Sequence, residues 1–284
     1  MQPQDTLNCA NSRHFCPMIT RFIYLCFIFL ATAAQAPAQG QFSLRLDTAS
    51  IPGLPGLHSF AIGKHAGKWL LIGGRQDGMH PKFGGFGANA ANQHIRVVDP
   101  VAGQVWQRPL TELPDTLQEQ LRSANMEFVQ YGETLLFGGG YGQSELAQNH
   151  ITYPYLTLIN IPGLIQAVTG NNPLLPHFQQ IRDTFFAVTG GQLQVLADTF
   201  YLVGGHRFDG VYSANSENPT QRYTDALSKF TLDGGQVTTK ARCRTNSTCT
   251  GETTTSALPF SPTENWALRH SPGFFSQASR WRRL

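Results

Sequence analysis

Cysteine is missing from the body of this 284-residue chain, since none lies between Gln39 and Lys240. The five cysteines stand near the two ends of the sequence, at Cys9, Cys16, Cys26, Cys243 and Cys249. Disulfide bonds therefore cannot form a framework for the body. A domain without such a framework must depend on its hydrophobic core.

Charge is also scarce, because Asp, Glu, Lys and Arg make up only 14% of the residues, about half the usual share. The formal net charge is +3, and Arg280, Arg282 and Arg283 at the C-terminus supply much of the excess. We therefore expect no nucleic-acid partner. By contrast, glycine (28 residues), proline (17) and aromatic residues (11%) are plentiful. This combination favours an all-β protein with many turns.

An uncharged apolar run near the N-terminus, "FIYLCFIFLATAA" at residues 22–34, is too short to span a bilayer comfortably, which takes about 20 residues. Ala36-Pro37-Ala38 follows and offers a small-residue cleavage site before Gln39. We therefore predict a signal peptide over residues 1–38, with Met18 as an alternative start. The mature protein would be secreted, periplasmic or on the outer surface of a bacterial cell, with no stable membrane span. A membrane anchor that is never cleaved is the alternative.

Three segments of the body repeat one pattern, an apolar strand that ends on two glycines and leads into a polar loop. They are "AGKWLLIGGRQDG" from Ala66, "YGETLLFGGGYGQ" from Tyr131 and "ADTFYLVGGHRFDG" from Ala197. The glycine pairs are Gly73-Gly74, Gly138-Gly139 and Gly204-Gly205, at spacings of 65 and 66 residues. Near-constant spacing of this kind indicates a repeat architecture.

Each repeat predicts a four-stranded antiparallel unit. A short apolar segment precedes each glycine-ended strand and would form a hairpin with it: "LHSFAIG" from Leu57, "NMEFVQYG" from Asn125 and "TFFAVTGG" from Thr184. A second strand pair follows in the first and third units, joined by the turns "DPVAGQ" and "LDGGQ". The second unit differs, because "PYLTLINIPGLIQAV" predicts one strand and then a short helix.

This arrangement resembles the kelch family of β-propellers. The matching features are the strands that end in Gly-Gly, the loops after them and Trp106 on the last strand of the first unit, although the tryptophan is not repeated. The resemblance implies an all-β fold, namely a partial kelch-type propeller of three four-stranded antiparallel blades. It covers residues 39–240, in units of about 41–115, 116–182 and 183–240. No cofactor is expected, because the cysteine-linked tyrosine of copper oxidases on related propellers has no cysteine to match here.

The double glycines predict close packing of the backbone. Strands of neighbouring blades crowd together at the inner end of a blade, where glycine allows both positive φ and close approach. The alternative is a phosphate-binding loop, which "GGRQDG" and "GGHRFDG" superficially resemble. That alternative lacks the following helix and the GKS or GKT sequence. We therefore interpret the three glycine pairs as structural.

The sequence changes character after Lys240. Residues 241–284 lose strand alternation, gather serine and threonine and end in basic residues, which predicts a disordered tail. Three blades are too few for a closed propeller, which typically has about four to eight. A permitted back-translation of residues 251–277, read one base earlier, gives "RRDYNLCPSVFPDGELGFTAFSGVFQ", which resembles the opening of a further unit. A frameshift near residues 240–250 is therefore a second hypothesis for this segment.

Functional side chains are expected in the loops after the glycine pairs, because binding residues concentrate on loops held by a rigid scaffold. The candidates are Arg75, Asp77, His80, His206, Arg207 and Asp209. If the units are equivalent, the two arginines occupy neighbouring positions on one face, where they could hold a carboxylate or a sugar. The alternative is that the two Asp-Gly pairs only form turns, with the arginines solvated or paired to those aspartates.

Two classes of function follow from these candidates. The first is a binding module whose propeller face holds a protein or a glycan. The second is a carbohydrate-active enzyme, such as a sialic-acid epimerase of the kelch kind, with loop arginines on a carboxylate. Binding is favoured, because no Ser-His-Asp or paired-carboxylate arrangement can be identified from spacing and the histidines show no metal-ligand spacing. A non-functional fragment is the third hypothesis.

Overall fold

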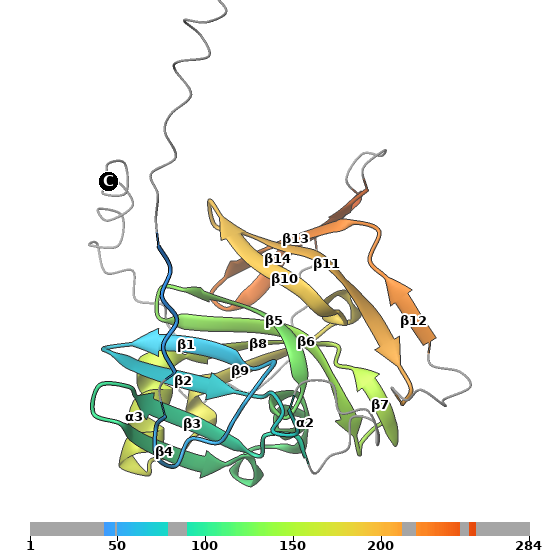
Figure 1. Cartoon of the computed structure of the whole chain (residues 1–284). Helices are drawn as coiled ribbons and strands as arrows, with labels where there is room; N and C mark the ends of the chain where they lie inside the picture. The colour runs from blue at the N-terminus through green and yellow to red at the C-terminus, as the bar shows by residue number, and fades with distance from the viewer. Residues whose placement is uncertain (1–42, 49, 79–89, 212–219, 245–249, 254–284) are drawn as a thin grey trace, which may run out of the picture. The chain divides into compact units, whose positions relative to one another are not determined.

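The computed structural model of the protein describes residues 43–48, 50–78, 90–211, 220–244 and 250–253. The predicted signal peptide, His80 and most of the predicted tail lie outside these ranges. Three antiparallel, blade-like sheets make up most of the described chain (Figure 1). The predicted all-β class is therefore confirmed. Among the described residues, no helix is both long enough and apolar enough to cross a membrane.

The first sheet is a four-stranded meander. Its strands lie in chain order, as β1 (Ala61–His65), β2 (Lys68–Ile72), β3 (His94–Asp99) and β4 (Gln104–Pro109). The predicted "DPVAGQ" turn joins β3 to β4, and Asp99 stabilises it. The carboxylate Oδ1 of Asp99 accepts the N–H groups of Val101 at 3.1 Å and Ala102 at 2.9 Å, which is the ordinary role of aspartate at the start of a turn.

The second sheet has four strands in the main path and one on a side branch. The main path is β5 (Ala124–Tyr131), β6 (Thr134–Ser144), β8 (Tyr155–Asn160) and β9 (Phe178–Arg182), and β7 (Asn149–Thr152) pairs with the far end of β6. The predicted short helix is present as α3 (Ile161–Gly170). It begins where the Asn160 side chain accepts the Gly163 N–H at 2.7 Å, which is a standard helix cap.

A second helix, α2 (Asp115–Leu121), connects the first sheet to the second and was not predicted. Its buried Gln120 fixes the second sheet to the helix through several hydrogen bonds. The Gln120 Oε1 accepts from the Thr157 hydroxyl at 2.6 Å and from the Gln180 amide at 2.9 Å, and its own amide donates to the Tyr155 carbonyl at 3.0 Å. The helix is therefore fixed to β8 and β9 by the hydrogen bonds of Gln120.

The third sheet is the largest. Its main path is β10 (Thr189–Leu196), β11 (Thr199–Asp209), β13 (Leu227–Asp233), β14 (Gln236–Cys243) and β15 (Thr250–Thr253), and β12 (Thr220–Tyr223) pairs with the far end of β11. The predicted "LDGGQ" turn joins β13 to β14.

Two predictions for the third unit were wrong. The start of "TFFAVTGG" is a short 3-10 turn, Thr184–Phe186, because the Asp183 side chain caps the Phe185 N–H and the strand begins only at Thr189. In addition, β14 continues three residues beyond Lys240, and residues 250–253 pair with it. These parts of the predicted irregular tail are therefore strands.

Two hydrophobic cores lie between the sheets, and β6 contributes to both. Because side chains alternate along a strand, Leu135 and Phe137 pack in the core shared with the first sheet, and Leu136 packs in the core shared with the third. Aromatic rings dominate the second core, where Phe230 lies 5.1 Å from both Phe186 and Phe200 between ring centroids. Full burial of each such side chain contributes roughly 1.5–3 kcal/mol.

The sequence repeat recurs in the backbone conformation. Ser59, Asn125 and Gly190 all have positive φ, at 57°, 55° and 70°. Each of these residues lies near the start of its sheet, at almost the same spacing as the glycine pairs. The pairs with positive φ are Gly73-Gly74, Gly139-Gly140 and Gly204-Gly205. The second pair therefore begins one residue later than predicted, because Gly138 is an ordinary strand residue opposite Glu127.

Candidate functional site

Each glycine pair forms a corner from which the chain departs and to which it returns. We call the segments that leave these corners, residues 75–78, 141–144 and 206–209, the post-glycine edge. The carbonyl of the second glycine accepts a backbone N–H of the returning chain in all three units. The hydrogen bonds run from Asn92 to Gly74 (2.9 Å), from Tyr153 to Gly140 (2.9 Å) and from Thr224 to Gly205 (3.0 Å).

The corrected register changes which side chains are equivalent. Arg75, Tyr141 and His206 each follow the second glycine directly, and their partners on the returning chain are Ala91, Thr152 and Tyr223. Arg207 is one residue further on, so Arg75 and Arg207 do not occupy equivalent positions. Their environments differ accordingly, since the Arg75 side chain is 4% exposed and that of Arg207 is 50% exposed.

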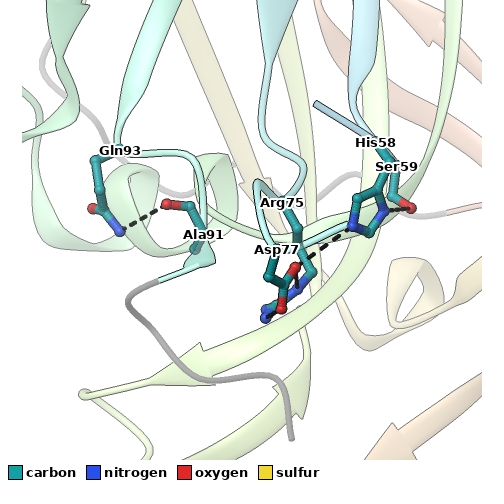
Figure 2. Close-up of polar contacts among 6 residues, drawn as sticks. All are labelled: His58, Ser59, Arg75, Asp77, Ala91 and Gln93. Carbon is teal, nitrogen blue, oxygen red and sulfur yellow. Dashed lines mark hydrogen bonds and ion pairs between the residues drawn. The ribbon is translucent and has the colours of Figure 1, made fainter. Parts of the chain in front are cut away.

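In the first unit, Asp77 lies between the Arg75 and His58 side chains (Figure 2). The Arg75 Nε donates to Asp77 Oδ1 at 3.0 Å, and Arg75 Nη2 donates to Oδ2 at 2.5 Å. On the other side, His58 Nε2 lies 3.5 Å from Asp77 Oδ1. The Arg75 guanidinium holds the pKa of Asp77 below its usual value, against the opposing effect of burial. The carboxylate therefore stays ionised and occupies one edge of the guanidinium.

Ser59, His58 and Asp77 follow one another in space, in the order of a Ser-His-Asp relay. The Ser59 Oγ lies 3.0 Å from His58 Nδ1 (Figure 2). The relay is not continuous, because the His58–Asp77 contact lacks hydrogen-bond geometry and Asp77 is already held by two Arg75 nitrogens. The positive φ of Ser59 belongs to a corner that Asn125 and Gly190 share. We therefore assign these residues a structural role.

In the third unit, the predicted residues lie on β11 beside β12. The Arg207 Nε donates to Asp209 Oδ2 at 2.7 Å. The His206 ring lies 5.6 Å from the Tyr223 ring between centroids, and burial lowers the pKa of His206. Tyr223 is 71% exposed, so an aromatic residue beside His206 is open to solvent.

The strand extensions of the second and third units brace each other. Thr152 on β7 both donates its hydroxyl to the Phe208 carbonyl and accepts the Phe208 N–H, each at 2.8 Å. The Tyr141 hydroxyl donates to the Gly210 carbonyl at 2.6 Å, and the Tyr141 ring meets the Phe208 ring edge-on at 5.2 Å. The third-unit residues of the post-glycine edge therefore rest on a rigid support.

Sequence reasoning missed several of these residues for a physical reason. His58 and Tyr141 lie within the repeated segments "LHSFAIG" and "YGETLLFGGGYGQ", but only the folded repeat shows that they reach the edge. Glu127 was missed as well, although it is a carboxyl group buried almost completely. It is 2% exposed between the second and third sheets, and its Oε1 accepts the Gly191 N–H at 2.7 Å. Burial raises the pKa of Glu127 to about 8.

Within the described ranges, no group of three or more His, Cys, Asp or Glu side chains is placed to hold a metal ion. No protein-family model matches the chain, and no curated protein matches it either.

Proposed function

We propose that this chain is a binding module of the kelch-propeller kind and that its protein or glycan ligand contacts the third-unit part of the post-glycine edge together with the adjoining strand β12. The observation that carries the proposal is the exposed Tyr223 ring beside His206 on a braced strand extension. An aromatic side chain adds large contact area at low entropic cost, and its ring stacks on apolar faces of sugars or peptides. The half-exposed Arg207 lies on the neighbouring strand and supplies polar contacts at the rim.

Binding suits this edge better than catalysis does. The arginines that would grip a substrate carboxylate in an epimerase-like enzyme are each held by an aspartate of their own turn. A rigid edge with one exposed aromatic ring needs no such free cation to hold a ligand.

The test is a glycan array probed with the full chain, followed by calorimetry on any glycan that binds. Tyr223→Ala and Arg207→Ala are expected to weaken binding about tenfold or more, as loss of a central contact does. Arg244→Ala is the matched control, because it removes another exposed arginine that is paired with an aspartate. Equal losses in all three variants would contradict the proposed site, and turnover of a bound glycan would support the enzyme instead.

We also propose that the protein is exported. The disulfide-bonded state of Cys243 supports this, because disulfides persist in oxidising compartments. N-terminal sequencing of the protein recovered outside the cytoplasm should begin at Gln39. A product that retains residues 22–34 would support the uncleaved anchor.

A further inference from the structure

The first and second sheets both contact the sheet that follows through their glycine pairs. Gly73 has φ +70°, and a Cβ on it would lie 2.7 Å from the Ser123 carbonyl oxygen of the next unit. Gly139 has φ +60°, and a Cβ on it would overlap the Val188 carbonyl oxygen of the third unit. The first glycine of each pair therefore leaves room for the carbonyl through which the chain enters the next sheet.

The second glycine of each pair binds that same carbonyl. The Gly74 N–H donates to Ser123 O at 2.8 Å, and the Gly140 N–H donates to Val188 O at 3.1 Å. Close approach and hydrogen bonding thus act together, and they occur at both junctions. The pair is a receptor for the backbone of a following sheet.

The third sheet carries the same pair, but nothing described occupies it. Gly204 has φ +67°, like its counterparts, and no described atom lies within 4 Å of the position of its Cβ. The neighbouring strand positions are also uncovered. Val203 is 47% exposed, whereas Ile72 at the equivalent position in the first sheet is 0% exposed. Tyr201 is half-buried where Leu70 is fully buried.

The described chain turns away from this receptor. In the first two units the outer strand leads on to Ser123 or Val188, which lies over the glycine pair. In the third unit β15 instead turns back along β14, with Thr253 opposite Thr239. A second copy of the chain is also a poor occupant. To dock there, the second copy would have to use the face of its first sheet that points away from its second sheet. Leu71 and Val98 on that face are already buried.

We propose that the outer face of β10 and β11 is a docking surface for one more antiparallel sheet of the same type, supplied by a separate polypeptide. The partner presents an entry carbonyl to the Gly205 N–H and an apolar face to Tyr201 and Val203. Its contacts repeat those that Ser123 and Val188 make at the two existing junctions. This surface is distinct from the post-glycine edge and does not depend on a ligand there.

Because the partner polypeptide is unidentified, the probe is a sheet of known type, residues 123–187 of this chain, fused after Leu284 of the full chain. Hydrogen exchange followed by mass spectrometry would report on the backbone amides of Val203 to Gly205. We expect their exchange to slow at least tenfold in the fusion.

Gly204→Asn is expected to remove this protection, because asparagine tolerates the φ value but its side chain fills the receptor. The matched control is Gly67→Asn, which has φ +77° and open space around it in the β1–β2 turn. Measuring the unfused Gly204→Asn chain separates loss of docking from failure to fold.

Three outcomes would overturn the proposal. The first is an unchanged exchange rate in the fusion, and the second is protection that survives Gly204→Asn. The third is protection of the unfused chain that rises with its concentration or disappears when the chain is ended at Thr253, since a second copy or the segment after Thr253 would then be the occupant.

Discussion

Replacement of Glu127 by glutamine should remove much of the pH dependence of stability. The Glu127 carboxyl group lies between the second and third sheets, where Oε1 accepts the Gly191 N–H and no hydrogen-bond partner is found for Oε2 among the described residues. Burial raises its pKa from 4.5 to about 8. The group is therefore protonated in the folded protein at neutral pH and ionised in the unfolded chain.

The direction of the pH dependence of stability follows from this raised pKa. The contribution of Glu127 to stability is fully present below pH 4.5, the unfolded value. It is lost as the pH rises towards the folded value of about 8. The loss is about 1.4 kcal/mol for each pH unit, or at most about 5 kcal/mol over the whole window. Glutamine keeps an acceptor for the Gly191 N–H and binds no proton, so this slope disappears in Glu127→Gln.

The assay is urea unfolding of both proteins at pH 5.5, 7 and 8. The difference in the free energy of unfolding between Glu127→Gln and the parent should shift in favour of the variant by about 3 kcal/mol from pH 5.5 to pH 8. Titration of the other groups cancels in this difference. Glu145→Gln, at an exposed glutamate, is the control and should show no shift. A difference that stays constant within about 0.5 kcal/mol would refute the reasoning.

Three further predictions concern stability and can be checked by denaturant unfolding. Gly139→Ala should cost roughly 1–3 kcal/mol more than Gly204→Ala, because both introduce the same backbone strain but only the first meets a neighbouring carbonyl. Equal costs would contradict the proposed receptor. Asp77→Asn should cost about 2 kcal/mol, since it removes the negative charge that two nitrogens of the buried Arg75 contact, whereas Asp209→Asn at an exposed pair should cost less than about 1 kcal/mol. The reverse order would contradict the burial argument. Gln120→Ala should lower the free energy of unfolding by about 2–3 kcal/mol, because a buried Thr157 hydroxyl loses its acceptor. A loss under about 0.5 kcal/mol would mean that the hydrogen bonds of Gln120 do not hold α2 to the second sheet.

Much of the fold was predictable because the repeat consists of short sequence signals that act locally. Apolar strands, Asp-Gly and Asp-Pro turns and double glycines each act within a few residues, so the strand pairs of the first and third units emerge from pattern alone. The one-residue error at Gly138 has a simple cause. Three consecutive glycines follow Phe137, and only the pairing of β5 with β6 shows which two turn the corner.

The candidate site was less predictable, because its geometry depends on contacts between distant segments. Arg75 and Arg207 look alike in sequence, since each precedes an Asp-Gly pair. Their burial differs because Arg75 directly follows the corner, where His58 and Ala91 flank it, while Arg207 lies one residue later on the alternate side of an exposed strand. The aromatic support of Tyr141 under Phe208 likewise has no signature in either segment alone.

The hydrogen bonds that close the glycine corners also affect which changes of sequence the protein tolerates. In each unit the chain leaves at the second glycine and is tied back to that glycine's carbonyl by Asn92, Tyr153 or Thr224. The two ends of the intervening segment are thus fixed by the sheet, whatever the segment contains. Lengthening a closed loop twofold costs only about 0.6 kcal/mol. The parts of these segments that lie beyond the braced strand extensions can therefore be exchanged or extended during evolution, or replaced by grafted sequences, while the sheets beneath keep their packing.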